Sequence, residues 1–297
     1  MTLRNDASTR ELINWGLLNS TRVGILLVLL MPLVVTSSTL FPFIVGKAIF
    51  ARSVIEVTFG LWILLLLVAP ENRPRRSWIL IAFGVWLLAS IIAGFAGVSL
   101  QRSLWSTYER MQGIVDLAHW VAFVLVAGSV FRTLTDWKWL LSINLGVSML
   151  AALLGLGHNF GIFELSILGT DARIESTLGN ATYVGAYTMV NILVALSLIA
   201  LSWREGRAET SQPVEVSVAA ASRAARRRRR RASRGQSQGS DFDWLPFIRA
   251  FWISAMVLEL WTLWLTETRG ALIGLGAGAV MFAAVYSIWG KIDLVKK

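Results

Sequence analysis

Four short polar clusters, each at the end of an apolar stretch, contain the residues best suited to chemistry in this chain. Each cluster sets basic side chains among hydroxyl, acid or amide groups. Their basic members are Lys47 and Arg52 in the first cluster, Arg110 in the second, Arg173 in the third and Arg269 in the fourth. Arginine suits phosphate because its planar guanidinium makes two parallel, charge-assisted hydrogen bonds. If the fold brings two to four of these side chains together, they would hold a diphosphate.

The first two clusters offer ion pairs as well as binding groups. Arg52 lies four residues before Glu56, so the two can pair on one helix face, either as part of a site or as a plain helix-end ion pair. In the second cluster, residues 105–113, Glu109 and Arg110 are neighbours that point in different directions, so we expect each to pair with another element. Asp116 and His119 follow at a spacing of three and should share one face. For His119 an interior, hydrogen-bonded role is favoured over catalysis.

The third cluster, residues 173–180, opens an apolar stretch with a turn. Gly179 and Asn180 suit a tight turn, and hydroxyl side chains can cap the helix that follows. The backbone N–H groups at that helix start, beside Arg173, predict an anion site. A capped loop without a ligand is the alternative.

The fourth cluster, residues 266–271, is a hairpin of a few residues between two apolar stretches. Gly270 is expected to supply the turn, and Glu267 and Arg269 are the charged members. A small-residue stripe of Gly270, Gly274 and Gly278 favours close helix packing. Glu259 lies inside the preceding apolar stretch and needs a partner.

The elements that position these clusters are membrane-spanning helices. The chain has 297 residues, of which 55% are hydrophobic and 15% charged, with a mean hydropathy of +0.61. About 20 apolar residues cross a bilayer as a helix, because lipid offers the backbone no other hydrogen-bond partners. Eight stretches meet this requirement, which predicts an all-α polytopic bundle: 23–40, 54–69, 77–94, 113–130, 139–156, 183–203, 245–265 and 271–289.

The distribution of basic residues orients these spans. With the N-terminus in the cytoplasm, 22 of the 28 Lys and Arg residues fall in inner segments and six in outer ones. Inner enrichment of Lys and Arg is the rule for cytoplasmic loops. The four polar clusters therefore lie on the outer face, and both termini lie inside. The predicted division is a cytoplasmic tail (1–22), six spans (23–203), a cytoplasmic loop (204–243), two spans (244–289) and a final tail (290–297).

The loop 204–243 contains the arginine run 226–231 and is expected to be disordered. An anchor lying against anionic lipid headgroups is the favoured interpretation. Its charge alone would permit nucleic-acid binding, but no aromatic residue interleaves the run to stack on bases. We expect no nucleic-acid partner. The absence of cysteine and the presence of only two histidines, His119 and His158, favour a protein without a metal or other cofactor.

Three of the outer motifs resemble the O-antigen ligase and polymerase superfamily of bacterial membrane glycosyltransferases. The motifs are Tyr108-Glu109-Arg110-Met111-Gln112-Gly113, Arg173-Ile174-Glu175-Ser176-Thr177-Leu178-Gly179-Asn180 and Thr268-Arg269-Gly270-Ala271. Their order, spacing and outward placement resemble those of that family, from about residue 41 to the end of the chain.

The resemblance implies an inverting, metal-independent transfer of glycan from an undecaprenyl-diphosphate carrier at the outer face of the bacterial inner membrane. The acceptor would be a lipid A core sugar, a growing glycan or a protein hydroxyl. Arg173 and Arg269 match family arginines that handle the diphosphate and are the expected catalytic residues. Expected substrate-binding residues are Lys47, Arg52, Glu109, Arg110, Asn180 and Glu267.

The chain departs from the family at its end. Family members continue into a large outer loop with a functional histidine, and neither His119 nor His158 occupies that place. We therefore expect this chain to be the N-terminal portion of a longer or split protein, or a truncated copy. A non-enzymatic component that binds or flips the lipid carrier is the alternative function. A small-molecule transporter is disfavoured because no inverted repeat is visible and the conspicuous polar residues lie at helix ends.

Overall fold

The computed structural model describes residues 2–162, 164, 173–210 and 244–295, and within them every regular element is a helix. The long helices are α1 (Thr2–Leu29), α2 (Val45–Val68), α3 (Trp78–Ala96), α5 (Ile114–Val130), α6 (Leu134–Asn159), α7 (Ala181–Thr210), α9 (Leu245–Leu265) and α10 (Arg269–Val295). Short elements join them: η1 (Met31–Leu33), η2 (Pro70–Asn72), α4 (Leu100–Trp105) and η3 (Ser176–Leu178). The all-α prediction is confirmed.

Seven of these helices are long and apolar enough to cross a membrane, and the 17-residue α5 is a shorter apolar helix. The chain is therefore a multi-pass membrane protein. The predicted span 245–265 coincides with α9. The first span differs most: α1 contributes Thr9–Leu29 rather than 23–40. Pro32 lies in η1 just beyond the end of α1, where its ring cannot continue the helix ladder.

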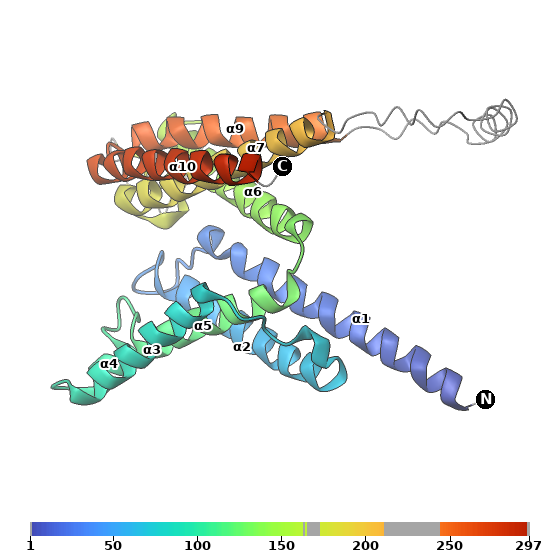
Figure 1. Cartoon of the computed structure of the whole chain (residues 1–297). Coiled ribbons are helices and arrows are strands. Elements are labelled where there is room, and N and C mark those ends of the chain that lie inside the picture. The colour runs from blue at the N-terminus through green and yellow to red at the C-terminus, as the bar shows by residue number, and fades with distance from the viewer. Residues whose placement is uncertain (1, 163, 165–172, 211–243, 296–297) are drawn as a thin grey trace, which may run out of the picture.

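The helices form two groups, which Figure 1 shows as a blue-to-green set and a yellow-to-red set joined by α6. In the first group, α1 packs along α2 and α5 around a core that includes Ile25, Leu65 and Val126. In the second, α7 packs on α6, α9 and α10, around Leu145, Leu198 and other residues. Hydrophobic residues of α6 contribute to both cores, so this helix ties the two groups together.

In Figure 1 the start of α1 lies at the right of the view, whereas α4 and the α9–α10 hairpin lie at the left. The predicted disorder of the loop 204–243 falls mainly outside the described residues, although 204–210 continue α7 as helix.

Arginines at the end predicted to face the cytoplasm, called the inner end below, connect helix termini to one another. Arg22 donates two hydrogen bonds to the Val130 carbonyl, 3.2 and 2.9 Å long, and lies 3.5 Å from Asp136. Asp136 in turn forms a capping box with Thr133 at the start of α6. Arg132 donates to the carbonyls of Ser129 and Arg73. Cationic donors on the last carbonyls of a helix satisfy groups that have no intrahelical partner.

Candidate functional site

A cavity of about 230 Å³ lies at the end predicted to face outward, called the outer end below, where the two helix groups meet. Its walls come from η1, the start of α2, the turn before α5, η3 and the start of α7. It is lined by Met31, Phe43, Ile44, Lys47, Ala48, Arg110, Gln112, Asp116, Trp120, Leu178 and Tyr183. Two predicted substrate-binding residues, Lys47 and Arg110, therefore line one cavity although they are far apart in the chain.

Lys47 is the buried cation of this cavity. Its side chain is 7% exposed, and its ammonium group donates a 2.6 Å hydrogen bond to the Thr177 carbonyl. The same group lies 5.8 Å from the centre of the Phe43 ring. No Asp or Glu forms an ion pair with Lys47 within the described residues. An ammonium group has three hydrogen-bond donors and a positive charge. A carbonyl and an aromatic face use only part of this capacity, and no anion balances the charge.

Arg110 reaches the cavity from the turn between α4 and α5. It is exposed, and neither it nor its neighbour Glu109 has a recorded side-chain partner among the described residues. The predicted pairing of these two residues with other elements is therefore not seen there. The turn itself contains two non-glycine residues with positive φ, Ser106 (62°) and Met111 (52°). Such conformations persist only where neighbouring contacts hold the backbone.

Arg52 provides that contact. Its guanidinium donates a short hydrogen bond to the Met111 carbonyl and pairs with the Asp116 carboxylate at 3.0 Å. The expected Arg52–Glu56 pair is therefore wrong. Both residues lie on the face of α2 that packs against α5, so each meets a partner there: Arg52 meets Asp116, and Glu56 meets His119 at 3.0 Å. Arg52 is a structural residue that holds the turn rather than a free phosphate ligand.

His119 occupies an interior position, as favoured from the sequence. Its Nε2 faces Glu56, and its Nδ1 lies 2.6 Å from the Val115 carbonyl. Asp116 and His119 also share one face of α5, as their spacing predicts. The two cross-helix pairs together fix the register of α2 against α5, and hence the position of the cavity wall.

The segment 173–180 connects the cavity to the α9–α10 hairpin. Its Thr177 carbonyl accepts from Lys47, and its Ser176 hydroxyl donates to the Ala151 carbonyl. Gly179 has φ +68°, and a Cβ there would lie 2.2 Å from the Phe43 ring, so no other residue fits without movement. Asn180 caps α7, because its side-chain oxygen accepts a 2.8 Å hydrogen bond from the Thr182 N–H. The cap is thus Asn180 rather than a hydroxyl residue, and it uses one of the N–H groups predicted to bind an anion.

Arg173 lies on the other side of this segment. Its Nε donates to the Thr266 carbonyl at 2.9 Å and its terminal nitrogen to the Thr268 hydroxyl at 3.3 Å. The Thr268 hydroxyl also lies 3.3 Å from the Ala181 carbonyl. These bonds tie the hairpin to the start of α7. Arg173 therefore lies beside the hairpin that carries Arg269, and the two predicted catalytic arginines belong to one corner of the molecule.

The hairpin turn differs from the prediction. Gly270 lies in the first turn of α10, and Glu267 adopts the positive φ, 52°, instead. Glu267 and Arg269 are both exposed, and neither side chain has a recorded partner in the described part of the chain. The glycine stripe packs as expected farther along α10, where Gly274 meets Met189 and Gly278 meets Leu193.

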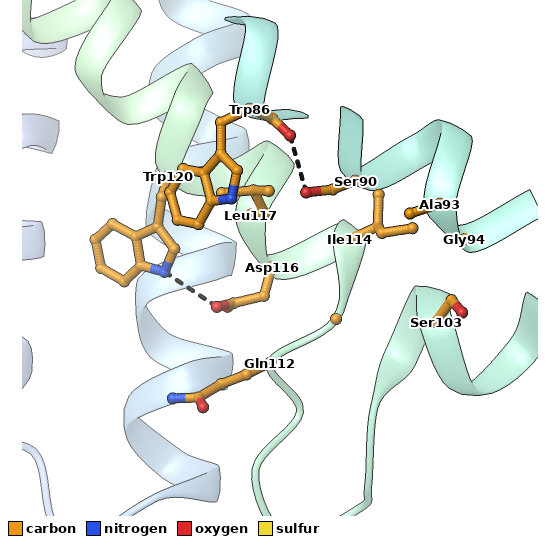
Figure 2. Close-up of a pocket in the computed structure, with 11 residues that line it drawn as sticks. Trp86, Ser90, Ala93, Gly94, Ser103, Gln112, Ile114, Asp116, Leu117 and Trp120 are labelled. Carbon is orange, nitrogen blue, oxygen red and sulfur yellow. Dashed lines mark hydrogen bonds between the residues drawn. The ribbon is translucent and has the colours of Figure 1, made fainter. Parts of the chain in front are cut away.

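A second cavity of about 600 Å³ adjoins the start of α5, between α3, α4 and α5. Figure 2 shows Trp86, Leu117 and Trp120 around it, with Asp116 accepting a 3.2 Å hydrogen bond from the Trp120 indole. Gln112, Asp116 and Trp120 line both cavities. The start of α5 is therefore a shared wall between a cationic cavity and a larger, mostly apolar one.

Sequence reasoning did not select Gln112, Trp120, Phe43 or Tyr183 as site residues, although all four line the cationic cavity. Gln112 belongs to the second outer motif, and Tyr183 follows the third by three residues, so proximity to the motifs was the available signal. No group of three or more His, Cys, Asp or Glu residues that could hold a metal ion occurs among the described residues.

Comparisons of the chain with models of known families, with curated proteins and with solved structures find no match. The fold and the site define a class: a multi-pass helical membrane protein with a cationic cavity at the end predicted to face outward.

Proposed function

We propose that this chain is a membrane glycosyltransferase of the O-antigen ligase and polymerase type, which transfers glycan from an undecaprenyl-diphosphate carrier at the outer face of the bacterial inner membrane. The observation that carries the proposal is the Lys47 ammonium group, buried beside Arg110 in an outer cavity without an acidic partner in the described residues. A diphosphate supplies the negative charge that these two cations lack.

The larger apolar cavity supports the same ligand class. A lipid-linked diphosphate needs a cationic site next to an apolar surface that opens toward lipid. The two cavities share the wall formed by Gln112, Asp116 and Trp120, and α3 beyond them is mostly exposed. A diphosphate near Lys47 and Arg110 would thus keep its lipid within reach of the bilayer.

In the proposed reaction an acceptor hydroxyl oxygen attacks the anomeric carbon as the bond from that carbon to the diphosphate oxygen breaks. The leaving diphosphate keeps the electron pair and takes up the proton of the acceptor hydroxyl, and cations placed beforehand stabilise the charge that develops. Arg269 is exposed on the first turn of α10, and its hydrogen-bond donors are available to the diphosphate. Arg173, by contrast, holds the hairpin in place. Glu109, Asn180 and Glu267 are exposed nearby in the motifs and would contact sugar or acceptor hydroxyl groups.

A carrier-binding or flipping component without transferase activity is the second candidate. It is favoured by one observation: Asp116 is the only carboxylate among the described residues that line the cationic cavity, and it is paired with Arg52. Both of its oxygens already accept hydrogen bonds, one from Arg52 and one from Trp120, so neither faces an acceptor hydroxyl unpaired.

Transfer from labelled undecaprenyl-diphosphate oligosaccharide in membrane vesicles tests the proposal. Wild-type protein should produce a glycan-modified acceptor, and Lys47→Met should lose that product. Lys138→Met is the matched control, since Lys138 is a lysine at the predicted inner end that pairs with Glu205. Carrier retention without any transferred product in the wild type would favour the carrier-binding candidate and contradict the transferase.

A further inference from the structure

A second polar cluster lies inside the helix bundle, away from the outer site. It is formed at the interface of α6, α7 and α9, where Glu259 is 0% exposed, and Ser148 and Asn191 are each 1% exposed. Asn144 and Tyr187 complete it. A carboxyl group at this depth in a membrane bundle is costly, and such groups normally serve a function or pair with another residue.

The hydrogen bonds within the cluster leave two side-chain oxygen atoms without a partner. The Ser148 hydroxyl donates a short bond to Glu259 Oε1, Asn144 donates to the Asn191 side-chain oxygen at 2.6 Å, and Asn191 donates to the Tyr187 carbonyl. Glu259 Oε2 and the Tyr187 hydroxyl are both buried without a hydrogen-bond partner. Both side chains therefore present oxygen lone pairs inside the bundle.

The charge of Glu259 is also unmatched. No Lys, Arg or His of the described residues forms an ion pair with it. The one titratable group that interacts with it is Tyr187, from α7, while α6 contributes the neutral Ser148 and Asn144. An ionised carboxylate here needs one positive charge from a source other than a side chain.

We propose that Glu259, Ser148 and Tyr187 form a binding site for one exchangeable monovalent cation, held as H⁺ when sodium is scarce and as Na⁺ when it is abundant. Carboxylate and hydroxyl oxygens are the ligands that hard cations prefer, and a single carboxylate balances a single charge. The site differs from the outer cavity in place and in sign, so it does not depend on the proposed glycan transfer.

Carbodiimide labelling tests this site in the purified full-length chain in detergent. N,N′-dicyclohexylcarbodiimide reacts with protonated carboxyl groups in apolar surroundings, and mass spectrometry locates the labelled peptide. We expect Glu259 to be labelled in choline chloride and labelled several-fold more slowly in sodium chloride of equal ionic strength. Labelling at the same rate in both salts, or no labelling in either, overturns the proposal.

Thermal unfolding gives an independent readout, because a ligand that binds only the folded state stabilises it. Sodium chloride should raise the melting temperature of the wild type above its value in choline chloride. This increase in melting temperature should vanish in Glu259→Gln and persist in the exposed control Glu71→Gln. In Ser148→Ala the same increase should require a higher sodium concentration. An equal sodium effect in Glu259→Gln and wild type would also overturn the proposed site. If Glu259→Gln does not fold, the sodium dependence of Ser148→Ala and the labelling data test the site instead.

Discussion

Basic residues occupy both ends of the helix bundle, and the two ends use them differently. At the inner end, Arg22, Arg132 and Arg249 donate to carbonyl groups of neighbouring segments, and Lys138 pairs with Glu205. At the outer end, Lys47 makes one hydrogen bond to a carbonyl, and no partner is recorded for the Arg110 and Arg269 side chains among the described residues. The inner cations hold helices together, whereas these outer ones have hydrogen-bond donors without a protein partner among the described residues.

Arg52 and Arg173 refine this comparison, because they are outer residues that behave like inner ones. Arg52 holds the turn before α5, and Arg173 holds the α9–α10 hairpin. Each positions a neighbour whose donors are available: Arg110 lies on that turn, and Arg269 begins the helix after that hairpin. The outer end thus contains supporting cations and, beside them, the cations that the proposed function assigns to a ligand.

Asp116→Ala should have the largest effect on stability. It leaves the Arg52 guanidinium, 11% exposed, without its carboxylate, and breaking a buried pair costs about 3–5 kcal/mol. Thermal unfolding in detergent, or native-state proteolysis, would measure the loss. Replacing both partners by apolar residues, Arg52→Met with Asp116→Leu, should recover much of the stability. Equal stability of Asp116→Ala and wild type would contradict the structural role of this pair.

Arg269→Lys should lower glycan transfer by about 10- to 100-fold, because lysine cannot form the bidentate fork on a diphosphate oxygen pair whose charge grows in the transition state. The protein should fold normally, since Arg269 is exposed. The measurement is transfer in membrane vesicles at equal protein level. Full transfer by this variant would remove Arg269 from the phosphate-binding set.

Arg110→Gln should weaken binding of a polyprenyl diphosphate by about tenfold, the effect of one charge-assisted hydrogen bond. Because Arg110 is exposed, this contribution should shrink as salt is added. A titration at low and high ionic strength measures both effects. Tyr108→Phe, at an exposed position of the same turn outside the cavity lining, is the control for general disturbance of the turn, and an equal loss there would point to the turn rather than to the arginine.

Arg22→Gln should have the smallest effect on the ligand and a modest effect on the fold. It removes the hydrogen bonds to the Val130 carbonyl and the contact with Asp136, which together contribute about 1 kcal/mol at this half-exposed position. Diphosphate binding should stay at the wild-type level. Reduced binding in this variant, with stability unchanged, would break the division between inner and outer cations.

Hydropathy predicted the helical class and most spans, because an apolar run of sufficient length has few alternatives to a helix in lipid. The prediction of helix ends failed where a single residue has more influence than the mean hydropathy of the segment. The predicted second span began at residue 54, but α2 begins at Val45, since Lys47 and Arg52 lower the local hydropathy while turning into the protein. Pro32, by contrast, lies within an apolar run, so hydropathy did not predict that α1 ends before it.

The site could be predicted only in part. Their residue type and their predicted side of the membrane selected Lys47, Arg110, Arg173 and Arg269 as candidate site residues, because outer basic residues are unexpected under the orientation rule. Sequence spacing could not show that Arg52 pairs with Asp116, 64 positions away, instead of Glu56 on its own helix. The sequence singled out Glu259 but not its neighbours, since these polar residues come one or two at a time from other helices.

The most direct test of the account compares the binding of farnesyl diphosphate, farnesyl monophosphate and farnesol to the detergent-purified chain and to Lys47→Met. The account predicts that the wild type binds the diphosphate more than tenfold more tightly than the alcohol, as expected for at least one charge-assisted hydrogen bond, and that Lys47→Met loses most of this preference. Equal affinity for all three compounds, or a preference for the diphosphate that survives Lys47→Met unchanged, would contradict a diphosphate site at this cavity.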